Sequence, residues 1–104
     1  MEKESKTTVL GGWTEPREVP HVQKYLDMLK GQVEAKFNTK FSVYEAFMYI
    51  DQLVQGMNYV VSIDVGKGDQ NFLEVQFYLP LTGDPQLTAA TDKNNKNAPL
   101  VPLV

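Results

Sequence analysis

The spacing of the apolar residues changes once along this 104-residue chain, close to residue 38, and this change constrains the fold most. Before it, apolar side chains recur every three or four residues and so fall on one face of a helix. Pro20 precedes most of this stretch, and proline suits the first position of a helix. The pattern therefore predicts one amphipathic helix over about residues 20–37. Its predicted apolar face consists of Val22, Leu26, Leu29, Val33 and Phe37.

After residue 40 the apolar residues alternate with polar ones, and β-branched and aromatic residues become frequent, which is typical of strands. Turn residues divide this part into predicted strands at 41–54, 57–65, 72–79 and 86–92. The first is long and has large apolar residues in both alternating sets, so we expect it to be curved and to contain a bulge. Gly66-Lys67-Gly68-Asp69 predicts a hairpin turn. The predicted core face of the third strand consists of Leu73, Val75, Phe77 and Leu79.

One helix cannot bury its apolar face alone, but an antiparallel meander with one apolar face can cover it. The sequence thus predicts an α+β fold, in which a curved antiparallel β-sheet of four to five strands wraps around one α-helix. The length fits a single domain over residues 1–104. Residues 1–10 are expected to form a flexible arm, and the proline-rich residues 94–104 an extended or loose tail.

Composition excludes several classes of function. The chain has no cysteine, which rules out disulfides, thiolate metal sites and cysteine nucleophiles and favours a reducing compartment. Its start lacks the apolar run of a secretory signal, and no stretch is long enough to span a membrane, so we expect a cytoplasmic protein. The net charge is −3 and the lysines are scattered, which argues against nucleic acid as a partner.

Residues that would support catalysis are few. His21 is the single histidine, and neither Ser42 nor Ser62 lies in a nucleophile-elbow sequence, so we interpret His21 as a partly exposed residue at the helix start. No spacing of acidic residues indicates a metal site, and nothing indicates a cofactor. The chain is therefore not expected to be an enzyme. Four acidic residues of the strands are interpreted as parts of solvated sheet faces, namely Glu45, Asp51, Asp64 and Glu74.

Three breaks in the chain remain to be explained: Gly11-Gly12, Gln55-Gly56 and Leu79-Pro80. Strand direction reverses at each turn of a meander, so the turns after the first and third strands lie at the same end of the sheet. An extended arm beside the sheet would bring Gly11-Gly12 to that end as well. We call these three segments together the three-part edge. Loops of a rigid scaffold often carry binding groups, although three ordinary turns would give the same pattern.

The same segments resemble the motifs of a known family. Gln52-Leu53-Val54-Gln55-Gly56 matches the Gln-x-Val-x-Gly loop of cystatins, and Met57-Asn58-Tyr59 resembles the Thr-Asn-Tyr that follows it in stefins. Gly11-Gly12 is similar to the N-terminal glycine site of the family. Leu79-Pro80 is similar to the Leu-Pro of the second stefin hairpin, and residues 32–36 resemble the end of the stefin helix. The resemblance covers roughly residues 11–93 and identifies the chain as similar to stefin-type cystatins.

The resemblance implies a reversible, competitive, tight-binding inhibitor of papain-like cysteine proteases of the cathepsin class. In the family, the N-terminal arm and two hairpin loops form a wedge that enters the active-site cleft. Carried over to this chain, the arm would fill apolar subsites and pass close to the catalytic thiol, the first turn would enter the cleft, and the second would cover apolar surface beyond it. Gln52 would brace the first turn. The implied binding residues are Val9, Leu10, Gly11, Gly12, Gln52, Leu53, Val54, Gln55, Gly56, Leu79 and Pro80.

Two alternatives to inhibition stay open. Gln55 stands where the family motif usually has a small residue, which is compatible with a cystatin-fold binding module or an engineered scaffold that does not inhibit proteases. In the other alternative, the long strands around residues 52–56 exchange between two chains and give a domain-swapped dimer instead of the expected monomer. Such exchange would straighten the first turn and abolish inhibition.

Overall fold

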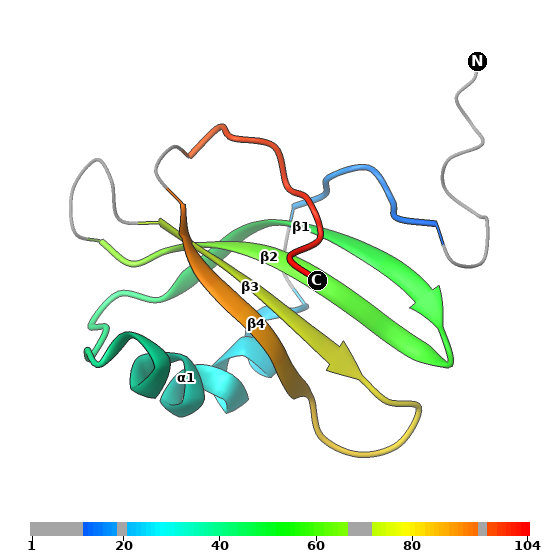
Figure 1. The fold of residues 1–104 in the computed structure, drawn as a ribbon, viewed down its shortest axis with the longest axis horizontal. Coiled ribbons are helices and arrows are strands. Elements are labelled where there is room, and N and C mark those ends of the chain that lie inside the picture. Colours follow the sequence, from blue (N-terminus) through cyan, green and yellow to red (C-terminus); the bar gives the residue numbers. More distant parts are fainter. Residues whose placement is uncertain (1–11, 19–20, 67–71, 94–95) are drawn as a thin grey trace.

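A computed structural model describes residues 12–18, 21–66, 72–93 and 96–104 of the chain. The described part forms one helix and four strands, and the strands make one antiparallel sheet in the order β1-β2-β3-β4 (Figure 1). The predicted α+β fold, a curved antiparallel sheet around one helix, is therefore confirmed. The elements are α1 (Gln23–Phe37), β1 (Glu45–Val54), β2 (Gly56–Asp64), β3 (Phe72–Leu79) and β4 (Gln86–Lys93).

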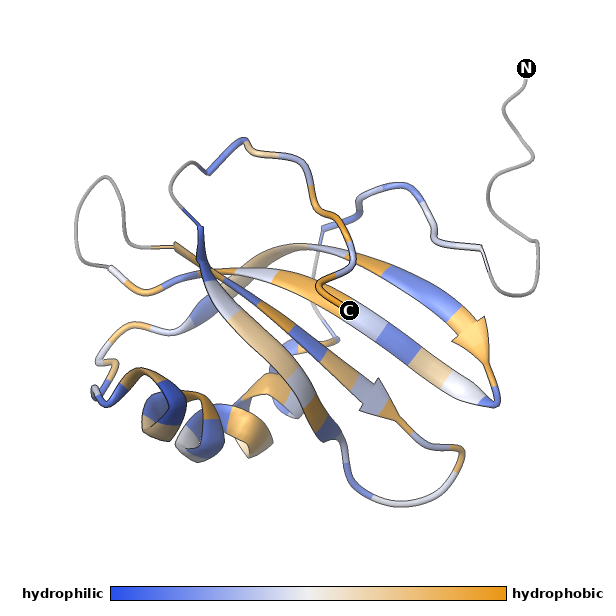
Figure 2. Cartoon of the chain, viewed as in Figure 1, coloured by the Kyte–Doolittle hydropathy of each residue, from blue (hydrophilic) through white to orange (hydrophobic). Residues whose placement is uncertain are grey.

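The helix lies against one face of the sheet, and the core fills the space between them (Figure 1). Leu26, Leu29 and Val33 of α1 are almost completely buried, as their spacing predicted. Figure 2 shows apolar and polar residues alternating along the strands that they meet. On β3 the predicted core face is confirmed for Leu73, Val75 and Phe77, which are buried. Leu79 is only partly buried, at the margin of the core.

Polar contacts fix both ends of α1. The helix begins at Gln23, three residues after the predicted start at Pro20, which lies outside the described residues. The Gln23 side chain donates a hydrogen bond to the carbonyl oxygen of Tyr44 (2.9 Å) and accepts one from the amide of Ala46 (2.8 Å), which ties the helix start to the beginning of β1. Asn38 caps the end of the helix: its φ of 54° is left-handed, a conformation that asparagine tolerates well, and its amide donates to the carbonyl oxygen of residue 35 (3.3 Å).

The first strand is shorter than predicted but contains the predicted bulge. Pairing with β2 begins at Glu45 instead of residue 41, because the preceding backbone bonds elsewhere: the amide of Phe41 donates to a carboxylate oxygen of Glu34 (2.8 Å). The aromatic side chains of residues 41 and 44 are nevertheless buried in the core. The register shifts between Ala46 and Met48, which confirms the bulge.

The opposite face of the sheet is crossed by residues 96–104 (Figure 1). The Gln76 side-chain oxygen accepts hydrogen bonds from the amides of Leu103 (2.7 Å) and Val104 (3.3 Å), so the predicted tail is tied to the sheet at these two residues. The interpretation of Glu74, also on this face, as a solvated residue was wrong. Glu74 is buried 3.4 Å from the Lys93 ammonium nitrogen.

Two other predictions concern His21 and the hairpin turn at Gly66. His21 is exposed beside the helix start, as predicted. Gly66 has a positive φ of 73°, and its amide donates to a carboxylate oxygen of Asp64 (2.7 Å), while the rest of the predicted hairpin turn lies outside the described residues. Among the residues that the structure describes, no helix is long and apolar enough to cross a membrane.

Candidate functional site

The first hairpin of the sheet turns within a single residue. Val54 of β1 pairs with Gly56 of β2, so Gln55 alone forms the tip, where its side chain is exposed. Gly56 has a φ of +112°, a conformation that residues with a side chain rarely adopt. Leu53 lies one residue before this turn and is about half exposed. The segment thus presents a narrow, sharply bent backbone with an exposed tip.

Gly56 also allows the first hairpin to lie directly against the second. A Cβ atom on Gly56 would overlap the carbonyl oxygen of Leu79 and would lie 3.1 Å from the Cα atom of Pro80. The two hairpins are also joined by a hydrogen bond, because the Tyr78 hydroxyl donates to the carbonyl oxygen of Gln55. The first hairpin is therefore buttressed by the beginning of the second.

Gln52 is braced across the first hairpin, on the face of the sheet away from the helix. Its side-chain oxygen accepts a hydrogen bond from the side-chain amide of Asn58 (2.8 Å), the residue that pairs with it on β2. The bond joins the two strands three residues before the tip. It restricts the twist and splay of the hairpin and so helps to fix the direction in which the tip points.

The second loop, residues 80–85, is held at both ends. Leu79 packs at the margin of the core, Pro80 is half-buried, and Pro85 at the far end is buried. Between them Gly83 has a φ of +112°, and a Cβ added there would lie 3.7 Å from the Pro80 ring. Leu81 projects from this loop with 80% of its surface exposed. The sequence pattern does not single out Leu81, because its exposure depends on how Pro80 and Pro85 hold the loop.

Residues 12–18, which follow the predicted arm and are called the arm from here on, pair with the outer side of β1. Trp13 forms a bridge with Gln52 and Arg17 forms one with Tyr49, both antiparallel. Because the pairing is antiparallel, residues that precede Trp13 lie beside the part of β1 that follows Gln52, close to the first turn. This places Gly12 at the same end of the sheet as the two hairpins. Val9, Leu10 and Gly11 lie outside the described residues.

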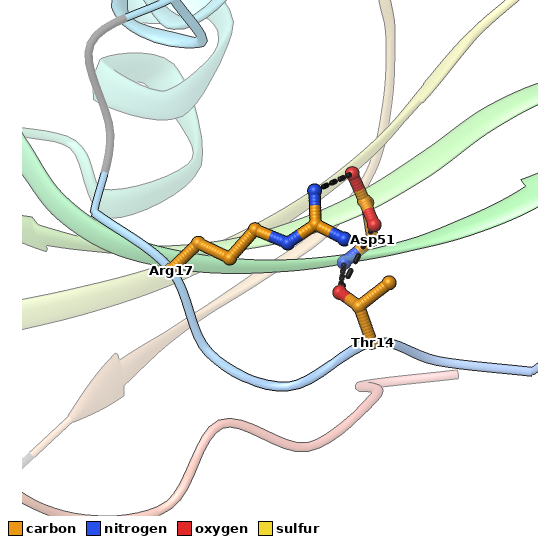
Figure 3. A network of polar contacts seen from close by, with 3 residues as sticks. All are labelled: Thr14, Arg17 and Asp51. Atoms are coloured by element: carbon orange, nitrogen blue, oxygen red, sulfur yellow. Dashed lines mark hydrogen bonds and ion pairs between the residues drawn. The ribbon is translucent and has the colours of Figure 1, made fainter. Parts of the chain in front are cut away.

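A polar cluster fastens this arm to β1 (Figure 3). The Thr14 hydroxyl donates to a carboxylate oxygen of Asp51 (3.0 Å) and accepts from the Asp51 amide (3.1 Å), and the Thr14 amide donates to the Asp51 carbonyl oxygen (2.9 Å). The Arg17 guanidinium lies 3.8 Å from the other carboxylate oxygen. The arm covers Asp51, so its interpretation as a solvated residue was also wrong. Burial and then the charge of Asp51 raise the pKa of the nearby Tyr59 to about 12.

Of the predicted site residues that the structure describes, all gather at one end of the sheet. They come from three separate stretches, namely Gly12, Gln52–Gly56 and Leu79-Pro80. In the described part of the chain, no group of three or more histidine and acidic residues is arranged to hold a metal ion. The three-part edge offers tight turns and backbone groups, and two exposed leucines, Leu53 and Leu81, lie beside it.

Comparisons with known proteins indicate the family of the chain. The family model described as "Cystatin domain" matches residues 11–97. The chain is 36% identical to leukocyte cysteine proteinase inhibitor 1 of Sus scrofa over 79% of this chain and 81% of that protein. It is 34% identical to cystatin-A of Mus musculus over 83% and 88%, and 34% identical to stefin-C of Bos taurus over 73% and 76% of the respective chains.

The fold and the three-part edge define a small binding protein in which one helix and a wrapped sheet support a set of turns. The chain belongs to the cystatin family, as a member of the stefin type. Members of this family are inhibitors and not enzymes, in agreement with what the sequence led us to expect.

Proposed function

We propose that this stefin-type cystatin is a reversible, competitive, tight-binding inhibitor of papain-like cysteine proteases of the cathepsin class. The observation that carries the proposal is the buttressed pair of hairpins. Gly56 lies against Leu79 and Pro80, the Tyr78 hydroxyl joins the hairpins, and Gly12 is brought to the same end by the pairing of the arm with β1. These contacts would make the described part of the three-part edge a preformed wedge.

Preformation has two consequences for binding. A wedge whose turns are already fixed loses little conformational entropy on entering a cleft, which favours tight binding. A cysteine protease cleaves a peptide that lies extended beside its catalytic thiol. Residues 54–56 instead form a tight turn that packs against Leu79 and Pro80. The turn would cover the catalytic residues without presenting a bond for cleavage, so inhibition would be reversible.

Exposed groups of the edge suit the parts of such a cleft. Gln55 at the tip would enter first, flanked by Leu53, while Gly12 would let the arm backbone pass close to the enzyme. The absence of cysteine is compatible with the reducing cytoplasm, where we place the protein. We propose that the monomer is the active form, because exchange of strands between chains would open the turn at Gln55.

The test is a titration of active papain with the purified monomer, isolated by gel filtration, with hydrolysis of a small peptide substrate as the readout. We expect activity to fall linearly to an end point at equal concentrations of inhibitor and active enzyme. At lower inhibitor concentration, the apparent KM should rise while kcat stays constant. Full activity in the presence of a large molar excess of monomer would refute the proposal. A serine protease assayed in the same way is the control and should keep its activity.

A further inference from the structure

We propose that Leu81 is the apolar anchor of the second loop and that it selects proteases with an apolar depression on the leaving-group side of the cleft. This inference rests on the proposed function and extends it to a residue that the family motif does not include. Leu79 and Pro80, which the motif does include, would mainly hold the loop in place.

Leu79, Pro80 and Leu81 differ in burial, and this difference assigns them different roles. Leu79 packs against the core and its carbonyl oxygen faces Gly56, so little of its side chain is available to a partner. Pro80 is half-buried, with its Cα atom against Gly56 and its ring facing Gly83. Leu81 makes no part of the core and is 80% exposed, more than any other large apolar side chain in the described ranges.

Exposure by itself assigns nothing, because single exposed leucines are common on protein surfaces. The place of Leu81 is what gives it meaning. It follows directly after the residues that contact the first turn, and it stands on a loop that is fixed by Pro80, by the left-handed Gly83 and by the buried Pro85. An apolar side chain on a fixed loop can be buried in a partner with little loss of conformational entropy.

The order of the segments indicates which part of a protease Leu81 would meet. The arm pairs with β1 and the second loop follows β3, so the two flank the first turn on opposite sides. With the arm in the subsites that precede the scissile bond, the second loop faces the subsites beyond it. Leu81 would fill an apolar depression there, and a protease with a polar or filled surface at that place would bind this chain less tightly.

The test compares inhibition constants for papain among variants of the monomer. Because burying a leucine side chain is worth about 1.5–3 kcal/mol, Leu81→Ala should raise the inhibition constant roughly ten- to a hundredfold. Leu81→Asn, which keeps the size but not the apolar character, should cause a similar loss, and Leu81→Met should restore binding. Met28→Ala is the matched control, because Met28 is 54% exposed on α1 and should leave inhibition unchanged.

The outcomes separate the two proposals. If the unmodified protein does not inhibit papain, the proposed function fails. If it inhibits and both Leu81→Ala and Leu81→Asn bind papain equally well, the role of Leu81 fails while the proposed function stands. Urea unfolding serves as the check on folding. Leu81→Ala should unfold at the same midpoint as the parent chain, since an exposed side chain contributes little to stability.

Discussion

Replacement of Gly56 by alanine should damage both the fold and the three-part edge. The change adds one methyl group at a residue whose φ is +112°. That methyl group would overlap the carbonyl oxygen of Leu79 and lie 3.0 Å from the Tyr78 hydroxyl oxygen. To make room, the first turn would have to move away from the second loop. The hydrogen bond from the Tyr78 hydroxyl to the carbonyl of Gln55 would then be stretched or lost.

The size of the effect follows from two terms. A residue with a side chain held at an unfavourable φ costs about 1–3 kcal/mol. Forcing an extra carbon into a filled space costs typically about 1–3 kcal/mol more. Together they predict a loss of about 2–6 kcal/mol in the free energy of unfolding, which is a large part of the roughly 5–15 kcal/mol that stabilises a typical domain.

The chain provides a matched control for this experiment. Gly31 lies in the interior of α1, and a Cβ added there meets nothing within 4 Å. The same substitution at Gly31 should therefore raise stability by about 0.5–1 kcal/mol, because alanine favours the helix. Urea unfolding followed by circular dichroism measures both variants, and papain titration measures their inhibition.

The expected pattern is thus one destabilised variant with weakened inhibition and one stabilised variant with unchanged inhibition. A Gly56→Ala variant that unfolds within about 0.5 kcal/mol of the parent, the range of ordinary surface substitutions, would refute the reasoning. It would mean that the two hairpins do not hold each other in solution.

Three further predictions follow from buried polar groups. Thr14→Val should lower the free energy of unfolding by about 1–3 kcal/mol and weaken papain inhibition, because the Asp51 amide and one Asp51 carboxylate oxygen lose the hydroxyl that they contact. Thr14→Ser should restore both, and an unchanged urea midpoint would contradict this. Lys93→Met should cost about 3–5 kcal/mol in urea unfolding by leaving the buried carboxylate of Glu74 without its cation, and adding Glu74→Leu should recover most of the loss. Burial raises the pKa of Tyr59 to about 12 and raises that of Tyr44 further, so the folded state disfavours tyrosinate. Stability should therefore be fully present below pH 10 and fall as the pH rises toward 12, which urea midpoints and an ultraviolet titration of tyrosinate would detect; a constant midpoint over that range would contradict the assignment.

Local signals were enough to predict much of the fold. β3 occupies the predicted residues, because its alternation is clean and turn residues bound it on both sides. The reversal of strand direction at each turn is enough to place the hairpins at Gln55-Gly56 and Leu79-Pro80 at one end of the sheet. The bulge in β1 was also readable, since apolar residues in both alternating sets cannot all face one core.

Features that depend on distant segments could not be predicted. Asp51 and Glu74 look like solvated residues in their strands. Asp51 is buried where residues 12–18 pair beside β1, and Glu74 is buried against Lys93 of β4, on the face that residues 96–104 cross. Neither covering segment has a periodicity that would reveal its position. The exposure of Leu81 likewise depends on how Pro80 and Pro85 hold the second loop, which no pattern of a few residues specifies.

The pairing of the arm with β1 has a consequence for solubility. The amides of Arg17 and Tyr49 each donate to the other residue's carbonyl oxygen (2.9 Å), and the Thr14 amide donates to the Asp51 carbonyl oxygen (2.9 Å). These bonds occupy the outer side of β1, which would otherwise be an open strand able to pair with other chains. Proteolytic removal of the arm would expose this template. The segment that would complete the wedge thus also protects the protein from self-association, so loss of the arm should reduce inhibition and promote aggregation together.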